Sequence, residues 1–167
     1  MIKKIKATKS EKIIFGFLIS LAIFFFGSYF LIKDKCFFVK NYDPRKISFD
    51  NPQNIVILNV SCGNVIIELY PDISPNAVKR FKTLVTSEAY DDVAFHRVIK
   101  GVLVQAGDLE FGKKNNLNYG KIGNGKSGLG TINSEVDYPF NFNKGSVGLA
   151  RTHKYNTEDS QFFIILR

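Results

Sequence analysis

The sequence predicts a mostly β domain of antiparallel strands that follows one N-terminal transmembrane helix. Three observations lead to this fold class. Residues 13–32 form an uncharged apolar run of about 20 positions, long enough to cross a bilayer as a helix. Residues 55–70 and residues 95–108 each contain two apolar-rich runs separated by a short turn, which is the pattern of a β-hairpin.

The chain divides into four segments by composition. These are a basic cytoplasmic tail at 1–12, a transmembrane signal anchor at 13–32, a linker at 33–53 and a folded domain at 54–167. Five lysines and one glutamate place half of the net charge of +8 in the tail. The linker is polar and contains two prolines, which disfavour regular structure.

The anchor predicts a single-pass protein of the inner (cytoplasmic) membrane. The lysines that precede the apolar run favour a cytoplasmic N-terminus, so the domain would face the periplasm, or the endomembrane lumen in a eukaryote. A cleavable signal peptide is the alternative, because a basic region also precedes the apolar core of such peptides. The length of the run and the lack of an A-x-A-like site favour an uncleaved anchor.

The domain begins with a predicted hairpin and a helix. Strands are expected at 55–60 and 65–70, with the turn at 61–64. Ser74 is expected to cap the following helix and Pro75 to occupy its first position. Apolar residues at helical spacing predict one amphipathic helix whose stripe faces the core, namely Val78, Phe81, Leu84 and Val85.

The second hairpin contains an always-charged side chain between apolar ones. Alternation places Phe95, Arg97 and Ile99 on one face of its first strand. A three-residue loop would set Arg97 opposite Gln105, whereas a two-residue loop would set it opposite Val104. The sequence alone leaves both registers open.

Two blocks of the domain resemble a known family. FHRVIKGVLVQAGD at 95–108, followed by GSVGLAR at 145–151 and SQFFI at 160–164, is similar to the core of cyclophilin-type peptidyl-prolyl cis-trans isomerases. The resemblance runs from about Ile55 to Arg167 and keeps the family's order. It implies an antiparallel β-barrel with a capping helix.

The resemblance also implies roles for individual residues. Arg97 matches the catalytic arginine, and Gln105 matches the glutamine that orients it. The expected substrate-binding residues are Phe95, Val102, Leu103, Ala150, Arg151, Gln161 and Phe163. The expected activity is peptidyl-prolyl isomerisation of folding chains that contain proline, with no cofactor and no metal.

Family members continue for some tens of residues beyond the SQFFI block. The resemblance therefore implies an incomplete barrel, in which the C-terminal strands, the second helix and part of the proline pocket are missing. A second hypothesis follows from this. The chain could be a truncated relic with weak or no catalysis, or a module that binds proline-containing peptides.

Other partners are not expected. GKIGNGKS at 120–127 satisfies the phosphate-loop pattern, but polar residues precede it and further glycines follow, so no strand and helix flank it. We therefore expect no nucleotide. Basic residues do not interleave with aromatics as a nucleic-acid platform requires, so we expect no nucleic acid. The only histidines, His96 and His153, are far apart, which argues against a metal site.

Two cysteines are present, Cys36 and Cys62, and their spacing fits neither a C-x-x-C motif nor a metal site. A disulfide between them is possible in an oxidising compartment. Two residues do not establish one, and we expect two unpaired thiols.

Overall fold

The computed structural model describes residues 8–33, 36, 39, 42–136 and 141–167. Contacts divide the chain into two units, residues 1–48 with 57–65 and residues 49–56 with 66–167. Most of the predicted tail 1–12 and parts of the predicted linker 33–53 lie outside the described residues. The described part of the linker contains two short 3-10 helices, Pro44–Lys46 and Pro52–Asn54.

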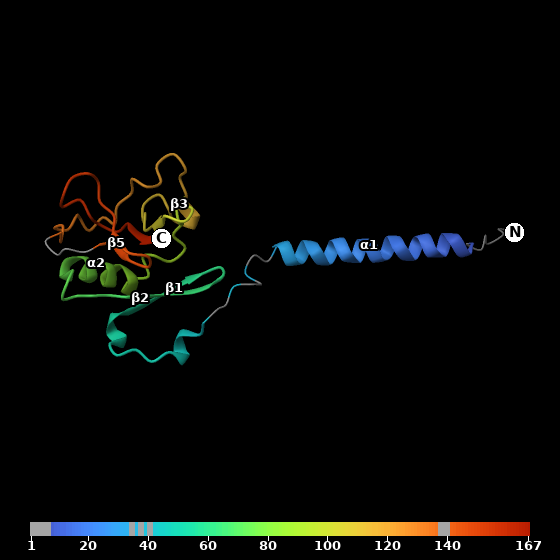
Figure 1. The fold of residues 1–167 in the computed structure, drawn as a ribbon. Coiled ribbons are helices and arrows are strands. Elements are labelled where there is room, and N and C mark those ends of the chain that lie inside the picture. The colour runs from blue at the N-terminus through green and yellow to red at the C-terminus, as the bar shows by residue number, and fades with distance from the viewer. Residues whose placement is uncertain (1–7, 34–35, 37–38, 40–41, 137–140) are drawn as a thin grey trace. The chain divides into compact units, whose positions relative to one another are not determined.

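The first unit contains α1 (Lys9–Lys33), drawn in blue in Figure 1. Its 25 residues extend over about 37 Å at 1.5 Å per residue, more than the roughly 30 Å of a bilayer core. None of its residues is buried, and an 18-residue window within it has a mean hydropathy of 2.2. Of the described residues, only this helix is long and apolar enough to cross a membrane. The prediction of a helix over 13–32 is confirmed.

The hairpin consists of β1 (Ile55–Val60) and β2 (Gly63–Glu68), which form a two-stranded sheet. The predicted turn at 61–64 is too long, because the second strand already begins at Gly63. The backbone there has a φ of 141°, a value that side-chain-bearing residues rarely adopt. The turn is therefore two residues, Ser61 and Cys62.

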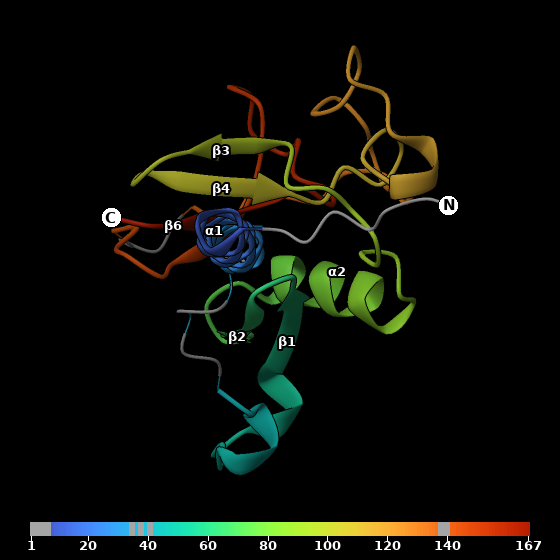
Figure 2. The same ribbon diagram turned by 90° about the vertical axis from the view of Figure 1, so that its right-hand side faces the viewer.

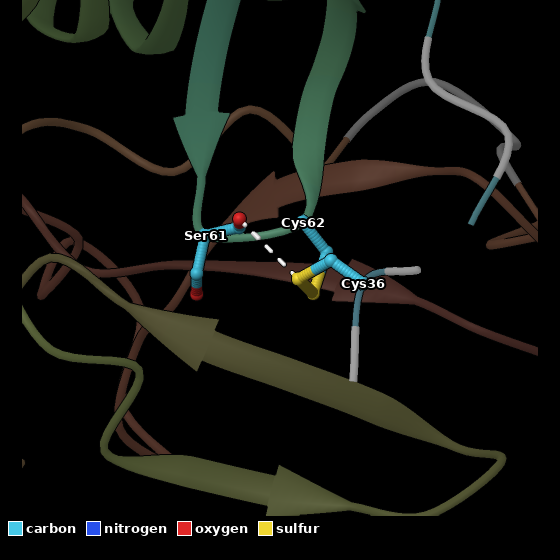
Figure 3. The surroundings of a disulfide bond; sticks show 3 residues. All are labelled: Cys36, Ser61 and Cys62. Carbon is cyan, nitrogen blue, oxygen red and sulfur yellow. Dashed lines mark hydrogen bonds between the residues drawn. A yellow bond between two sulfur atoms is a disulfide. The ribbon is translucent and has the colours of Figure 1, made fainter. Parts of the chain in front are cut away.

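Cys62 in this turn forms a disulfide with Cys36, with a Cα–Cα distance of 4.8 Å (Figure 3). The expectation of two unpaired thiols is wrong. The cysteines are separated by 26 positions, so only the folded path of the chain brings their sulfur atoms together.

The second unit is built on a four-stranded antiparallel sheet. Its strands are β3 (Arg97–Ile99), β4 (Leu103–Ala106), β5 (Val147–Leu149) and β6 (Phe162–Ile165), in the order β3-β4-β6-β5. Figure 2 shows β3 and β4 side by side. A three-residue loop joins them, so Arg97 lies opposite Gln105, and the alternative register with Val104 is excluded. A third 3-10 helix, Lys114–Asn116, follows β4.

One face of this sheet is covered by α2 (Pro75–Thr86). Phe81 of the helix packs edge-on against Phe162 of β6, with ring centroids 5.3 Å apart, and Tyr90 contacts both rings. Burying each such ring stabilises the fold by about 2–3 kcal/mol. Of the four residues of the predicted apolar stripe, Val78, Phe81 and Leu84 are buried and Val85 is half-buried.

The start of α2 differs from the prediction. Pro75 occupies the first turn, but the Ser74 side chain forms no capping hydrogen bond. Instead the Glu135 carboxylate accepts hydrogen bonds from the backbone N–H groups of Asn76 (2.7 Å) and Ala77 (3.1 Å). A cap supplied from nearly 60 residues away leaves no local sequence signal.

The described strands form one two-stranded and one four-stranded sheet, and these do not close into a barrel. The predicted class is therefore confirmed as an antiparallel β fold with one helix on its sheet, preceded by an apolar helix.

Candidate functional site

The register of the large sheet aligns one residue from each strand in a single row. Arg97 of β3 lies opposite Gln105 of β4, Gln105 opposite Phe163 of β6, and Phe163 opposite Gly148 of β5. Directly opposed residues point to the same face of an antiparallel sheet. Because Phe162 points to the helix-covered face, the row lies on the other face. Three residues predicted separately from sequence are thus brought together.

Hydrogen bonds connect the side chains of this row to a loop. The Arg97 Nη1 donates to Gln105 Oε1 (3.3 Å), and Gln105 Nε2 donates to Gln161 Oε1 (3.0 Å). Gln161 Nε2 in turn donates to the carbonyl oxygens of Gly123 (2.9 Å) and Gly125 (3.1 Å). Both amide hydrogens of Gln161 are thereby used. This fixes which atom of each amide faces its neighbour and keeps an acceptor directed at the guanidinium.

The loop itself is held by Asp108, which is fully buried. One carboxylate oxygen accepts the N–H groups of Glu110 and Phe111, and the other accepts those of Gly123 (2.6 Å) and Gly125 (2.9 Å). Burial opposes ionisation, but these four donors outweigh it and hold the pKa of Asp108 below its ordinary value. A Cβ at Gly125 would lie 2.0 Å from a carboxylate oxygen, so only glycine fits there.

The four hydrogen bonds to Asp108, which we call the Asp108 clamp, explain the phosphate-loop pattern at 120–127. The backbone amides that would face a phosphate are bound to Asp108 instead. Lys126 donates from Nζ to the Thr157 carbonyl oxygen (3.3 Å), and the Ser127 backbone N–H donates to Asp159 Oδ2 (2.6 Å). The glycines, the lysine and the serine of the pattern therefore all make contacts within the chain.

Asp159 also joins this loop to α2. Its carboxylate forms a buried salt bridge with Arg80, whose Nη1 also donates to the Gly130 carbonyl oxygen (2.7 Å). The exposed fractions of the two side chains are 3% for Asp159 and 11% for Arg80. Little water solvates either charge, so each group depends on the other to offset its cost of desolvation.

Among the other predicted site residues, Leu103 and Phe95 lie near the row. Leu103 is two positions from Gln105 on the same strand, so it points to the same face. The half-buried Phe95 lies two positions before Arg97. Val102, in contrast, belongs to the three-residue loop and is 43% exposed.

The segment after β5 contains two further predicted residues. The Ala150 N–H donates to the Gln161 carbonyl oxygen (2.7 Å), which extends the pairing with β6. The Arg151 guanidinium lies over the Tyr155 ring, 4.6 Å from its centroid, and 3.7 Å from a Glu158 oxygen. The Arg151 side chain is therefore engaged within its own loop and not with Arg97 or Gln105.

Two aromatic side chains near the row were not predicted to have a role. Phe142 contacts Phe163 edge-on, with ring centroids 5.2 Å apart. It lies in a polar stretch, Asn-Phe-Asn-Lys, whose lack of periodicity hides the contact from sequence analysis. The His96 ring lies against Gly123, and its two nitrogens are buried without a hydrogen-bond partner in the described chain. Burial lowers the pKa of His96.

Comparison with known proteins identifies the fold. The family model described as "Cyclophilin type peptidyl-prolyl cis-trans isomerase/CLD" matches residues 55–167. A Brucella suis protein named "Probable peptidyl-prolyl cis-trans isomerase" is 40% identical over 116 residues, which cover 69% of this chain. The chain spans 59% of that protein's own length.

Solved structures show the same likeness. A Cryptosporidium parvum cyclophilin-type peptidyl-prolyl cis-trans isomerase, solved in the presence of the dipeptide Ala-Pro, is 30% identical with a TM-score of 0.52. The match covers 62% of each chain. Cyclophilin AquaCyp293 from Hirschia baltica has a TM-score of 0.54 at 21% identity, covering 75% of this chain and 65% of its own. This last likeness concerns the fold alone.

Proposed function

The chain belongs to the cyclophilin-type peptidyl-prolyl cis-trans isomerase family, and on that premise we propose that it accelerates rotation about X-Pro bonds. The observation that carries the proposal is the row in which Gln105, hydrogen-bonded to Arg97 on one side, lies opposite the apolar ring of Phe163 on the other. Its substrates would be unfolded or folding polypeptides that contain proline.

The chemistry follows from the amide bond. Rotation must cross a barrier of about 18–20 kcal/mol, because conjugation keeps the peptide planar. At the top of the barrier the proline nitrogen has lost conjugation and becomes a better hydrogen-bond acceptor. Arg97 is always charged, and among the described residues only one of its guanidinium nitrogens is bonded, to Gln105, so other N–H groups can donate to this nitrogen. A donor that binds the twisted state more tightly than the planar one lowers the barrier without a cofactor.

The apolar helix and the disulfide support a location outside the cytoplasm. We infer that α1 is an uncleaved signal anchor with residues 1–12 in the cytoplasm and the domain on the periplasmic side of the inner membrane. Positively charged residues before a membrane span favour this orientation. The disulfide between Cys36 and Cys62 supports it, because such bonds persist in oxidising compartments and are rare in the cytosol.

A second candidate is a module that binds proline-containing peptides with weak or no catalysis. Two observations favour it. The described strands do not close a barrel, and Arg97 is exposed on an edge strand. Water around a guanidinium weakens its interaction with a developing acceptor.

One experiment separates the two. Cis-trans exchange of an Ala-Pro tetrapeptide is measured by NMR with the full chain in detergent, for wild type, Arg97→Ala and Arg97→Lys. For an isomerase, kcat/KM falls about 100-fold in Arg97→Ala, the order expected for one removed donor, and partly recovers in Arg97→Lys. Equal exchange rates with wild type and Arg97→Ala would favour the binding module.

A further inference from the structure

Phe142 is an exposed aromatic residue that contacts the row of the candidate site. Of the described phenylalanines after α1, it alone is exposed, with 59% of its surface accessible. Its edge nevertheless rests on Phe163, with an interplanar angle of 65°. The ring is thus held on one side and open on the other.

Gly148 explains how this ring comes to lie above the sheet. It ends the row that begins with Arg97 and brings no side chain of its own. A Cβ at Gly148 would lie 2.8 Å from Phe163 Cζ and 3.0 Å from Phe142 Cε1. Both rings therefore occupy the space above Gly148 of β5. Because Gly148 has no side chain, the Phe142 ring, which comes from a loop, fills the fourth position of the row.

The order of the row sets which group each side of a bound proline ring would face. Across the sheet the row runs from Arg97 through Gln105 to Phe163, and the Phe142 ring lies next to Gly148 at the far end of the row. The guanidinium and the Phe142 ring therefore lie on opposite sides of Phe163, with Gln105 between Arg97 and Phe163. In the pyrrolidine ring the nitrogen lies on one side and Cγ on the other. A proline that lies over Phe163 with its nitrogen toward Arg97 therefore turns Cγ toward Phe142.

We propose that Phe142 is a substrate-binding residue that contacts the ring carbons of the proline, opposite the side that Arg97 contacts. The inference rests on the proposed function, because it takes the proline to lie over Phe163. It adds an apolar wall that comes from a loop and not from the sheet. Such a wall binds the planar and the twisted amide equally, since rotation leaves the pyrrolidine ring unchanged. It therefore acts on KM and not on kcat.

The test compares Phe142→Ala, Phe142→Leu and wild type in the full chain in detergent. The probe is an Ala-Pro tetrapeptide, and its Ala-Ala counterpart is the reference ligand. We expect Phe142→Ala to weaken binding of the Ala-Pro peptide, and to raise KM, by about three- to tenfold, the order of one lost aromatic contact. Phe142→Leu keeps an apolar wall and should recover most of this loss. Binding of the Ala-Ala peptide should not change.

Tyr119→Ala is the matched control, because Tyr119 is an aromatic residue that is 85% exposed. It should leave both binding and KM unchanged. Unaltered binding of the Ala-Pro peptide by a folded Phe142→Ala variant would overturn the inference, whatever its rate of catalysis. If that variant fails to fold, equal binding by Phe142→Leu and a Phe142→Asn variant would overturn it. If Arg97→Ala loses activity and Phe142→Ala binds and turns over the Ala-Pro peptide like the wild type, the proposed function holds and the role of Phe142 is refuted.

Discussion

Gln105 and Gln161 are joined by one hydrogen bond, 3.0 Å from Nε2 of Gln105 to Oε1 of Gln161, although they lie 56 positions apart in the chain. This bond connects the side chain that holds Arg97 to the loop that Asp108 clamps. The orientation of the arginine therefore depends on a buried carboxylate that does not touch it.

Replacing Gln161 should disturb Arg97 through Gln105. In Gln161→Leu the Gln105 amide loses the acceptor that orients it, so we expect kcat for an Ala-Pro peptide to fall about three- to tenfold, as for one hydrogen bond of about 1 kcal/mol. Gln105→Leu should cost at least as much. The double variant should cost less than the sum of the two in free energy, because both act on one chain of hydrogen bonds. Strictly additive effects would show that the two glutamines act independently.

Asp108 should make the stability of the domain sensitive to acid. A carboxyl whose pKa is lower in the folded than in the unfolded chain stabilises the fold above its unfolded pKa. That contribution is lost as the pH falls through the lower, folded pKa. We therefore expect the free energy of unfolding of the wild type to decrease below about pH 4. Asp108→Asn should remove part of this dependence and cost on the order of 2–3 kcal/mol at pH 7.

Urea unfolding between pH 2 and pH 7 measures the Asp108 effect. Glu110→Gln, which alters a neighbouring exposed carboxyl, is the control and should leave the stability at pH 7 unchanged. If Asp108→Asn loses stability in acid as steeply as the wild type, other carboxyls account for the acid sensitivity.

The buried pair of Arg80 and Asp159 should be costly to break from one side. Asp159→Ala leaves a guanidinium that is 11% exposed without its partner, and such a change costs about 3–5 kcal/mol. Replacing both charges, as in Arg80→Met with Asp159→Ala, should cost less than Asp159→Ala alone. Denaturant unfolding of the single and double variants measures the difference. A double variant less stable than the single one would contradict a mutual desolvation cost.

Removing the disulfide should lower the free energy of unfolding, because the unfolded chain gains conformational entropy when the bond no longer constrains it. The bond closes a loop across a separation of 26 positions, for which chain entropy predicts about 3–4 kcal/mol. Cys36→Ser with Cys62→Ser should lose this stability, and dithiothreitol should lower the wild type to the same level. Mass spectrometry after alkylation without reductant checks that the bond forms. Free thiols in protein isolated from its native membrane would contradict both the bond and the proposed oxidising location.

Much of the local structure was predictable because it depends on neighbours in the chain. The uncharged apolar run at 13–32 has the length and composition of a long apolar helix, and α1 covers it. The spacing of Val78, Phe81 and Leu84 likewise marked the buried side of α2. The apolar runs around 55–68 and 97–106 predicted two hairpins, although the first turn proved shorter than expected.

The sequence by itself determined the fold class, the family resemblance and the candidates Arg97, Gln105 and Phe163, because each is written in a short pattern. Only the tertiary structure decided the register that aligns these three. It also decided the pairing of Cys36 with Cys62 and the clamp of Asp108 on a glycine-rich loop. Each of these depends on groups brought together by the path of the chain, and most are distant in sequence. Local propensity carries no information about such contacts, whose free energy appears only when the whole domain folds.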